Sequence, residues 1–306
     1  MEAPVTSRSP RVLAVVVTYN AMQWADRCFG SLLASSPRPD VLAVDNGSTD
    51  GTCEHVAAAF PEVEVLRNTE NQGFGAANNI GLRRALERDY DFVYLMNQDA
   101  WVGEGTLRLL LEAHRPEYGV LSPMQLSAEG IPDANFRRKC GRSLERAGVL
   151  MEARPGKTSA NAGDCIVEVP FVMAAHWLLS REAIRRTGGF SPAFRQYGED
   201  DNFIDRLHWH GLKCGVVPAA AAVHDRSGRN LPKEKRMRLK CVVPVVKLSN
   251  PGCCLPLRII LEPLELVAMS LKNFSIYPLR RLPELMRRLP ELKRLRAASM
   301  SEGAFL

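Results

Sequence analysis

The chain has 306 residues, of which 46% are hydrophobic and 24% charged, a composition typical of one large globular domain with an appendage, or of two small domains. No apolar run reaches the ~18 residues that a transmembrane helix needs, and the first ten residues contain no apolar segment typical of a secretory signal. The eight cysteines form no CxxC pair, which indicates a reducing, cytosolic setting where they mostly fill the core.

The net charge of +6 is unevenly distributed along the chain. Residues 226–306 contain 17 Lys and Arg but 6 Asp and Glu, a net charge of +11, so residues 1–225 carry −5. An acidic body argues against nucleic acid as a partner, because phosphate contacts need Lys and Arg on the docking surface. A basic C-terminal region suits the anionic surface of a membrane.

Short apolar strands alternate with helices in the first part of the chain. This alternation predicts an α/β fold, with a doubly wound, mostly parallel sheet flanked by helices. The expected elements are a strand at 12–17, a helix ending at 33, a strand at 40–44, a helix at 53–60, a strand at 63–66, a helix ending near 89, a strand at 92–96 and a helix at 106–114.

Residues 123–165 are polar and less regular, and we expect an excursion that lines or covers the acceptor side of a site. Regular structure resumes at 165–180 with one or two strands. A helix follows over 181–187, ended by Gly188-Gly189, and another begins at Glu199 and continues through His210.

Polar clusters follow the carboxyl end of each of the first four strands. They are Thr18, Asp45-Asn46, residues 68–71 and residues 97–99. Each cluster alone is typical of a turn, but the carboxyl ends of parallel strands form the rim where such sheets bind ligands. Four clusters at one rim therefore predict a binding site. Asp99 either caps the next helix or supplies an acid to this site.

Three acids begin the helix at 199, namely Glu199, Asp200 and Asp201. The positive end of the helix dipole stabilises acids there, but three exceed what capping requires, and one of them is a candidate general base. His224 is expected in a loop beyond the next strand. If it met Asp99 across the rim, the two could hold a metal ion.

Five motifs occur in the order found in inverting family 2 glycosyltransferases of the GT-A fold. They are VVVTYN (15–20), VDNGSTDGT (44–52), ENQGFGAANNIG (70–81), LMNQDA (95–100) and GGFSPAF with YGEDDNF (188–203). The chain most resembles the rhamnosyltransferase-like branch of that family, over roughly residues 11–228.

The resemblance implies a nucleotide-sugar donor site along the rim. Thr18, Asp45 and Asn46 match positions that hold the base and ribose. Asn71, Gly73 and Asn78 match the loop and helix start under the ribose and pyrophosphate, where free N–H groups suit phosphate. The remaining members of the expected donor site are Tyr19, Asn20, Asn97 and Gln98.

The resemblance also implies a metal site and a catalytic base. Asp99 matches the last acid of the DxD motif and His224 a metal-binding histidine, so Mg²⁺ or Mn²⁺ is expected on the pyrophosphate. Asn97 replaces the first acid of DxD and brings no charge. Asp200 matches the usual base, with Glu199 beside it and Asp201 as the alternative base.

The expected protein is therefore a glycosyltransferase that moves a sugar, with rhamnose as one candidate, from a dTDP-, UDP- or GDP-sugar to a glycan or lipid-linked acceptor. The alternative is an inactive GT-A-fold protein that only binds nucleotide or glycan. We expect an N-terminal extension over 1–10 and a GT-A domain over 11–228. The latter has a nucleotide-binding half (11–122) and an acceptor half (123–228).

The C-terminal region, 229–306, is expected to be helical and basic. The hexapeptide RRLPEL recurs after seven residues, and the leucines of 280–296 form one helical stripe, while Pro283 and Pro290 predict two short helices or one kinked helix. This region either anchors a cytoplasmic protein at the inner face of the membrane or packs against the body or a dimer partner. The sequence does not decide the oligomeric state.

Overall fold

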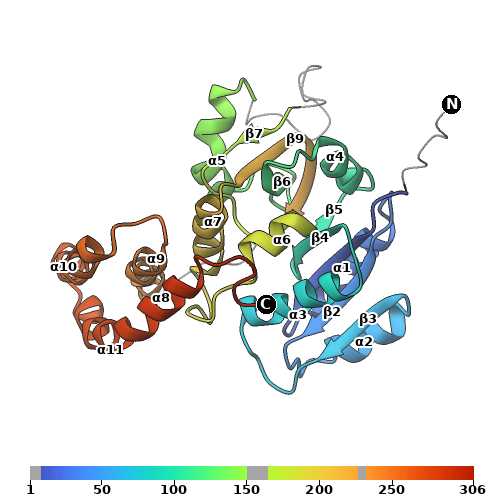
Figure 1. The fold of residues 1–306 in the computed structure, drawn as a ribbon. Coiled ribbons are helices and arrows are strands. Elements are labelled where there is room, and N and C mark those ends of the chain that lie inside the picture. The colour runs from blue at the N-terminus through green and yellow to red at the C-terminus, as the bar shows by residue number, and fades with distance from the viewer. Residues whose placement is uncertain (1–7, 150–164, 227–231) are drawn as a thin grey trace.

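A mixed sheet of nine strands forms the centre of the computed structural model, which describes residues 8–149, 165–226 and 232–306 (Figure 1). Most of the predicted N-terminal extension, the end of the predicted excursion (150–164) and the predicted domain boundary at 228 lie outside the described residues.

The first half of the sheet consists of four parallel strands in the order β3-β2-β1-β4. These strands are β1 (Val12–Thr18), β2 (Asp40–Asp45), β3 (Val63–Arg67) and β4 (Phe92–Asn97). The near-continuous apolar sequences of β1, β2 and β4 are explained by burial on both faces, whereas the edge strand β3 is partly exposed and contains Glu64 and Arg67. Because these four strands run in parallel, their carboxyl ends lie at one edge.

Beyond β4 the sheet is mixed, in the order β8-β6-β9-β5. The bounds are β5 (Ala100–Val102), β6 (Tyr118–Leu126), β7 (Val167–Glu168), β8 (His176–Ser180) and β9 (Lys213–His224). The antiparallel pairing of β5 with β9 places Ala100 opposite His224. His224 is thus the last residue of a strand, and its expected place in a loop was wrong.

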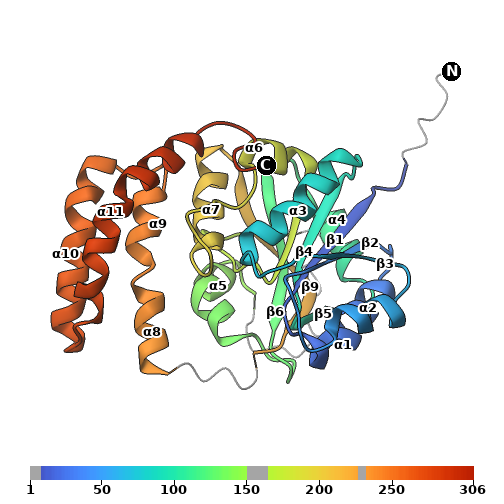
Figure 2. The same ribbon diagram turned by 90° about the horizontal axis from the view of Figure 1, so that it is seen from below.

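Helices cover both faces of the sheet, as Figure 2 shows for α1 and α2 on one side and α3 and α6 on the other. The helices α1 (Met22–Leu33), α2 (Thr52–Ala59) and α4 (Thr106–Ala113) pack on one face. The opposite face carries α3 (Phe74–Glu87), α5 (Ala134–Arg146), α6 (Arg181–Thr187) and α7 (Glu199–Trp209). The predicted doubly wound α/β architecture is confirmed.

Residues 118–146 are more regular than the sequence indicated. The expected excursion begins inside β6 and continues into α5, whose first turn is capped by the Asp133 carboxylate accepting from the N–H groups of Asn135 and Phe136. In α5, Phe136, Cys140 and Leu144 recur every fourth residue, a helical spacing that the sequence analysis missed because the rest of the segment is polar. Packing of Phe136, among others, against the main core stabilises it.

Four helices form a C-terminal unit beside α7 (Figures 1 and 2): α8 (Lys233–Lys240), α9 (Val243–Ser249), α10 (Leu255–Asn273) and α11 (Tyr277–Ala298). The leucine stripe of α11 faces inward, with Leu285 and Leu292 buried in a cluster that includes Phe194 of the α/β body that contains the sheet. This stripe therefore packs against the body and does not form an exposed apolar face. One helix continues through both prolines.

No helix in the described part of the chain is both long and apolar enough to span a membrane. All eight cysteines are unpaired, and half of them are buried, as expected for small core residues.

The last residues of the chain return to the α/β body, close to α6 (Figure 1). The Gly189 N–H donates to the Ala304 carbonyl at 2.8 Å, and the Asn79 amide donates to the Phe305 carbonyl at 3.3 Å. The Phe305 ring lies 5.0 Å from the buried Arg206 guanidinium. These contacts fix the C-terminal unit to the α/β body at a second place, in addition to the cluster around Phe194.

Candidate active site

A cavity of about 1150 Å³ opens at the carboxyl edge of the parallel strands. This volume is large enough for a nucleotide sugar together with part of an acceptor. Of the residues that the sequence analysis singled out, the following line it: Tyr19, Asn46, Asn71, Gly73, Asn97, Gln98, Asp99, Glu199, Asp200 and His224. The structure thus brings together residues separated by about 200 positions in the chain.

Beneath the cavity, buried polar groups join the ends of β1 and β2. The Thr18 hydroxyl donates to Asp45 Oδ1 at 2.9 Å, and the Ser48 N–H donates to Asp45 Oδ2 at 2.9 Å. Asn20 accepts from the Thr49 N–H at 2.9 Å. Thr18, Asn20 and Asp45 do not line the cavity, and their hydrogen bonds hold the loops that do.

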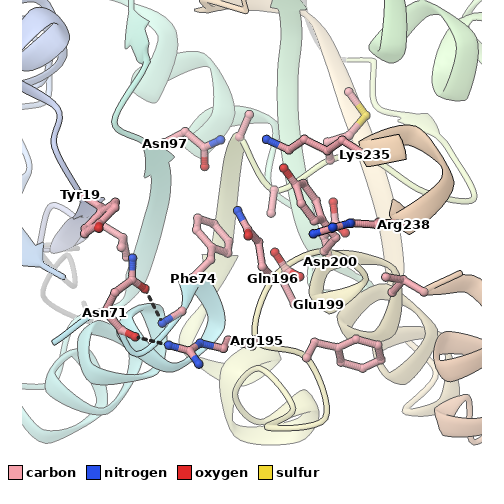
Figure 3. A pocket seen from close by; sticks show the side chains of 18 of the residues that line it. Tyr19, Asn71, Phe74, Asn97, Arg195, Gln196, Glu199, Asp200, Lys235 and Arg238 are labelled. Atoms are coloured by element: carbon pink, nitrogen blue, oxygen red, sulfur yellow. Dashed lines mark hydrogen bonds between the residues drawn. The ribbon is translucent and has the colours of Figure 1, made fainter. Parts of the chain in front are cut away.

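Asn46 organises the loop between β3 and α3. Its Nδ2 donates to Asn71 Oδ1 and to the Gly73 carbonyl, both at 3.3 Å, and its Oδ1 accepts from the Gln72 N–H at 3.2 Å. Gly73 has φ +90, and a Cβ there would lie 2.3 Å from the Arg195 carbonyl, so only glycine fits. Figure 3 shows Asn71 beside Arg195 at this end of the cavity.

Gln98 ties the loop after β1 to the end of β4. Its Oε1 accepts from the Tyr19 N–H at 2.7 Å, and its Nε2 donates to the Tyr19 carbonyl at 3.2 Å. Asn78 is buried inside α3, where its Nδ2 donates to the Phe74 carbonyl at 2.9 Å. It does not line the cavity, so its expected contact with the donor stays a prediction.

Asp99 and His224 meet at the cavity wall as the sequence analysis expected. The distance from Asp99 Oδ1 to His224 Nε2 is 3.4 Å, and both side chains are 1% exposed. Asn97 Nδ2 lies 3.4 Å from the same nitrogen, while its Oδ1 is buried with no hydrogen-bond partner among the described residues. A carboxylate, an imidazole and an unpartnered amide oxygen form a donor set that fits Mg²⁺ or Mn²⁺.

These residues would supply only part of a coordination shell. The described residues include no group of three or more His, Cys, Asp or Glu side chains placed to hold a metal. Mg²⁺ commonly binds through one or two carboxylates and completes its shell with substrate phosphates and water. The site therefore fits a cation that arrives with a diphosphate.

Three acids begin α7, but only two face the cavity. Glu199 and Asp200 line it, whereas Asp201 lies 3.9 Å from Lys139 outside it. Burial, followed by the charges of Asp200 and Asp201, raises the pKa of Glu199 to about 8. Burial and the charge of Asp201 raise the pKa of Asp200 to about 6.

These pKa shifts separate the roles that the two cavity acids can take. Near neutral pH Asp200 is mostly ionised, and its pKa is close to the working pH, as an efficient general base requires. Glu199 is mostly protonated, so it is suited to donate a hydrogen bond. One Glu199 oxygen is buried without a partner among the described residues.

Several cavity residues were missed by the sequence analysis. Arg195 comes from the loop before α7, and four further cations come from α8 and α11: Lys235, Arg238, Arg281 and Arg288. The sequence analysis expected the basic C-terminal region either at a membrane surface or packed against the body or a dimer partner, and did not expect it to line the cavity. The one signal in the sequence was the opposite net charge of residues 1–225 and 226–306, which indicated that the basic region could contact the acidic body.

Comparisons with known proteins place this architecture in a family. The family described as Glycosyl transferase family 2 matches residues 13–188. The chain belongs to glycosyltransferase family 2, and it is a nucleotide-sugar-dependent glycosyltransferase with a GT-A-type fold.

Two curated relatives illustrate the similarity. The chain is 29% identical over 233 residues to an N-acetylglucosaminyl-diphospho-decaprenol L-rhamnosyltransferase of Mycobacterium tuberculosis, covering 70% of this chain and 75% of that protein. It is 40% identical over 108 residues to an undecaprenyl-phosphate mannosyltransferase of Micrococcus luteus, covering 34% of this chain and 44% of that protein.

Solved structures agree on the fold. The mannosyltransferase PcManGT from Pyrobaculum calidifontis, in complex with GDP-Man and Mn²⁺, superposes with a TM-score of 0.54 at 19% identity, covering 97% of this chain and 76% of that chain. GalNAc-T7 with UDP, GalNAc and Mn²⁺ superposes with a TM-score of 0.57 at 15% identity, covering 80% and 51%.

Proposed function

We propose that the chain transfers a sugar, with inversion, from a nucleoside-diphosphate sugar to a hydroxyl group of a glycan or lipid-linked acceptor. The observation that carries this proposal is a single cavity with two distinct ends. The Asn46–Asn71 rim and the Asp99–His224 pair suit a nucleotide diphosphate, and Asp200, on another wall, suits an acceptor hydroxyl.

Asp200 acts as the general base in this proposal. As the acceptor oxygen attacks the anomeric carbon, the Asp200 carboxylate takes the hydroxyl proton, and the bond from the anomeric carbon to the diphosphate oxygen breaks. The leaving nucleoside diphosphate keeps the electron pair. Asp99 and His224, with Asn97 beside them, would hold Mg²⁺ or Mn²⁺, which when bound neutralises charge on the leaving diphosphate.

Rhamnose, carried by dTDP, is the sugar we propose to test first. The mycobacterial relative, which aligns over most of both chains, is named as a rhamnosyltransferase. The relative from Micrococcus luteus is named as a mannosyltransferase and aligns over a third of this chain. One methylene or hydroxyl in a pocket changes sugar discrimination modestly, so a donor panel must decide.

The test is hydrolysis of dTDP-rhamnose, UDP-N-acetylglucosamine and GDP-mannose, each with Mg²⁺, Mn²⁺ or EDTA, together with calorimetric binding of each donor. We expect slow, metal-dependent release of nucleoside diphosphate from one donor. Binding of a donor without any release, even when glycan and lipid-linked acceptors are added, would favour the binding-only alternative. Absence of both binding and release would overturn the proposal.

We also propose that the protein works at the inner face of the cell membrane and contacts it through α10. One face of this helix exposes large apolar side chains, each at least 39% exposed: Leu257, Ile260, Leu261, Leu264 and Leu271. The excess of basic residues in 226–306 complements anionic lipid. An apolar helix face with basic surroundings is typical of an interfacial helix.

Co-sedimentation with vesicles containing phosphatidylglycerol tests this placement. We expect Leu264→Ser with Leu271→Ser to reduce binding at least tenfold, because each exposed leucine that enters the lipid contributes about 1.5–3 kcal/mol. The control is Ile131→Ser, an exposed apolar residue (59%) outside the C-terminal unit. Equal binding by the double variant and the wild type would exclude α10 as the contact.

A further inference from the structure

One wall of the active-site cavity is cationic and comes from the C-terminal helices. Lys235 and Arg238 extend from α8, and Arg281 extends from α11 into the same cavity that contains Glu199 and Asp200. Figure 3 shows Arg238 on the same side of the cavity as Asp200, away from Tyr19 and Asn71, and Lys235 extending between this side and Asn97. We call Lys235, Arg238 and Arg281 the basic wall.

The partners of the basic wall leave it available to an anion. Arg238 pairs with Glu234 at 2.6 Å and Arg281 with Glu284 at 2.7 Å, each within one helical turn. Such solvent-exposed pairs contribute about 0–1 kcal/mol and exchange easily. Lys235 has no hydrogen bond or ion pair with any residue in the described ranges. By contrast, Arg288 donates to the Ala193 carbonyl at 2.8 Å and is held in the interface.

An anionic ligand at this wall could belong to the donor or to the acceptor. The donor diphosphate has its own place, at the Asn71–Gly73 loop and the Asp99–His224 pair. The base must touch the acceptor hydroxyl, so groups that lie on the base's side of the cavity, away from the donor, contact the acceptor. Arg238 lies on that side (Figure 3), and Lys235 and Arg281 line the same cavity from the same two helices, which assigns the anion of the basic wall to the acceptor.

Apolar side chains adjoin the basic wall. Cys241, Val242 and Val245, at the end of α8 and in α9, line the same cavity. A free sugar or a polar glycan gains nothing from this strip, whereas a lipid chain attached to a phosphate would contact both the strip and the cations. Phosphate oxygens bound by Lys and Arg form charge-assisted hydrogen bonds, which are among the stronger ones in proteins.

We propose that the acceptor is a sugar joined to a lipid through a phosphate or diphosphate, and that Lys235, Arg238 and Arg281 bind this anionic link. The proposal rests on the proposed function and names the acceptor class for the same site. It also gives the C-terminal unit a role in substrate binding, because the acceptor site is incomplete without α8 and α11.

The test uses farnesyl diphosphate as a probe for the lipid-linked anion. Its binding is measured by calorimetry in EDTA, first alone and then with dTDP, UDP and GDP in turn at saturation, so that the donor site is occupied whichever nucleotide it takes. We expect binding of farnesyl diphosphate, weaker binding of inorganic diphosphate and no binding of farnesol. The combined change Lys235→Gln, Arg238→Gln and Arg281→Gln should weaken farnesyl diphosphate binding about 10- to 100-fold or more.

The matched control is Arg236→Gln with Arg287→Gln, which removes exposed arginines from α8 and α11 that do not line the cavity. This control should bind farnesyl diphosphate as the wild type does. If the control weakened farnesyl diphosphate binding as much as the triple variant does, the effect would come from the overall charge of the surface. If added nucleoside diphosphate abolished farnesyl diphosphate binding, the basic wall would belong to the donor site. Either result overturns the proposal, as does equal binding of inorganic and farnesyl diphosphate.

The outcome is separable from the proposed function. Donor hydrolysis by the wild-type protein needs no acceptor, so its absence counts against glycosyl transfer while the calorimetric result still reports on the wall. Thermal unfolding of the triple variant checks that it is folded, and the single variant Lys235→Gln, at an exposed position, repeats the test with the least disturbance.

Discussion

The identity of the base can be tested by the paired variants Asp200→Asn and Asp201→Asn, which remove one charge each from adjacent residues. Asp200 lines the cavity, whereas Asp201 lies outside it against Lys139. General-base catalysis contributes about 10²- to 10⁴-fold. We therefore expect Asp200→Asn to lower kcat by that factor and Asp201→Asn to retain most of the wild-type activity.

The pH profile gives a second, quantitative readout. With a pKa of about 6 for Asp200 in the ligand-free protein, about 10% of the base is ionised at pH 5, so kcat/KM at pH 5 should be about a tenth of its plateau. The charge of Asp201 contributes to that raised pKa. Asp201→Asn should therefore move the acid limb of the profile to lower pH and raise the relative activity at pH 5.

The assay is steady-state transfer, or donor hydrolysis where no acceptor is in hand, between pH 4.5 and 8 with folding monitored by circular dichroism. Wild-type turnover in Asp200→Asn, or a loss in Asp201→Asn as large as in Asp200→Asn, would refute the assignment. An acid limb unmoved by Asp201→Asn would refute the electrostatic explanation of its position.

Three further changes test the site and its support. Glu199→Gln should stabilise the fold at pH 7 by up to about 3 kcal/mol and have little effect at pH 4. Burial raises the pKa of Glu199 from its ordinary value of 4.5 to about 8, so the stability of the wild type falls as pH rises between these two values. Urea unfolding measures the free energy of unfolding at pH 4 and pH 7, and an equal gain from Glu199→Gln at both pH values would contradict this explanation. Asp99→Asn should weaken Mn²⁺-supported donor binding at least tenfold while leaving donor binding in EDTA unchanged, as measured by calorimetry. An equal loss of donor affinity with Mn²⁺ and in EDTA would exclude a role of Asp99 in metal binding. Phe305→Ala should lower stability by about 1–2 kcal/mol through loss of its contact with Arg206, whereas Phe274→Ala, at a residue 99% exposed, should change the unfolding midpoint little.

The sequence alone determined the parallel half of the sheet and the rim of the site. The alternation of apolar strands and helices is visible in the periodicity of neighbouring residues, and the turn residues at the strand ends are also a local feature of the sequence. For this reason the motifs around Asn46, Asn71 and Asp99 could be placed at one edge before any tertiary contact was known. The sequence pattern also singled out the acids at 199–201 and His224, the family resemblance selected Asp200 among those acids as the base, and the structure brings Asp200 and His224 to the cavity.

Only the tertiary structure decided what the remaining faces contact. The leucine stripe of α11 has the periodicity of a buried face or of a membrane face, and the pattern is the same for both. Packing against α10 and α9 buries Leu285 and Leu292, and this leaves apolar residues of α10 exposed instead. Whether the leucine stripe contacts protein or lipid depends on which surface lies opposite it in the fold, and the periodicity of the sequence does not specify that surface.

The same reason explains the basic wall. Lys235 and Arg281 are surface-type residues in a basic segment, and sequence spacing does not show that they share a cavity with Asp200, which lies more than 30 positions away from each of them in the chain. The fold brings them to the wall that contains Asp200 because α8 to α11 pack on Phe194 and its neighbours. Local patterns therefore define the side of the cavity that we propose for the donor, and long-range packing creates the side that we propose for the acceptor.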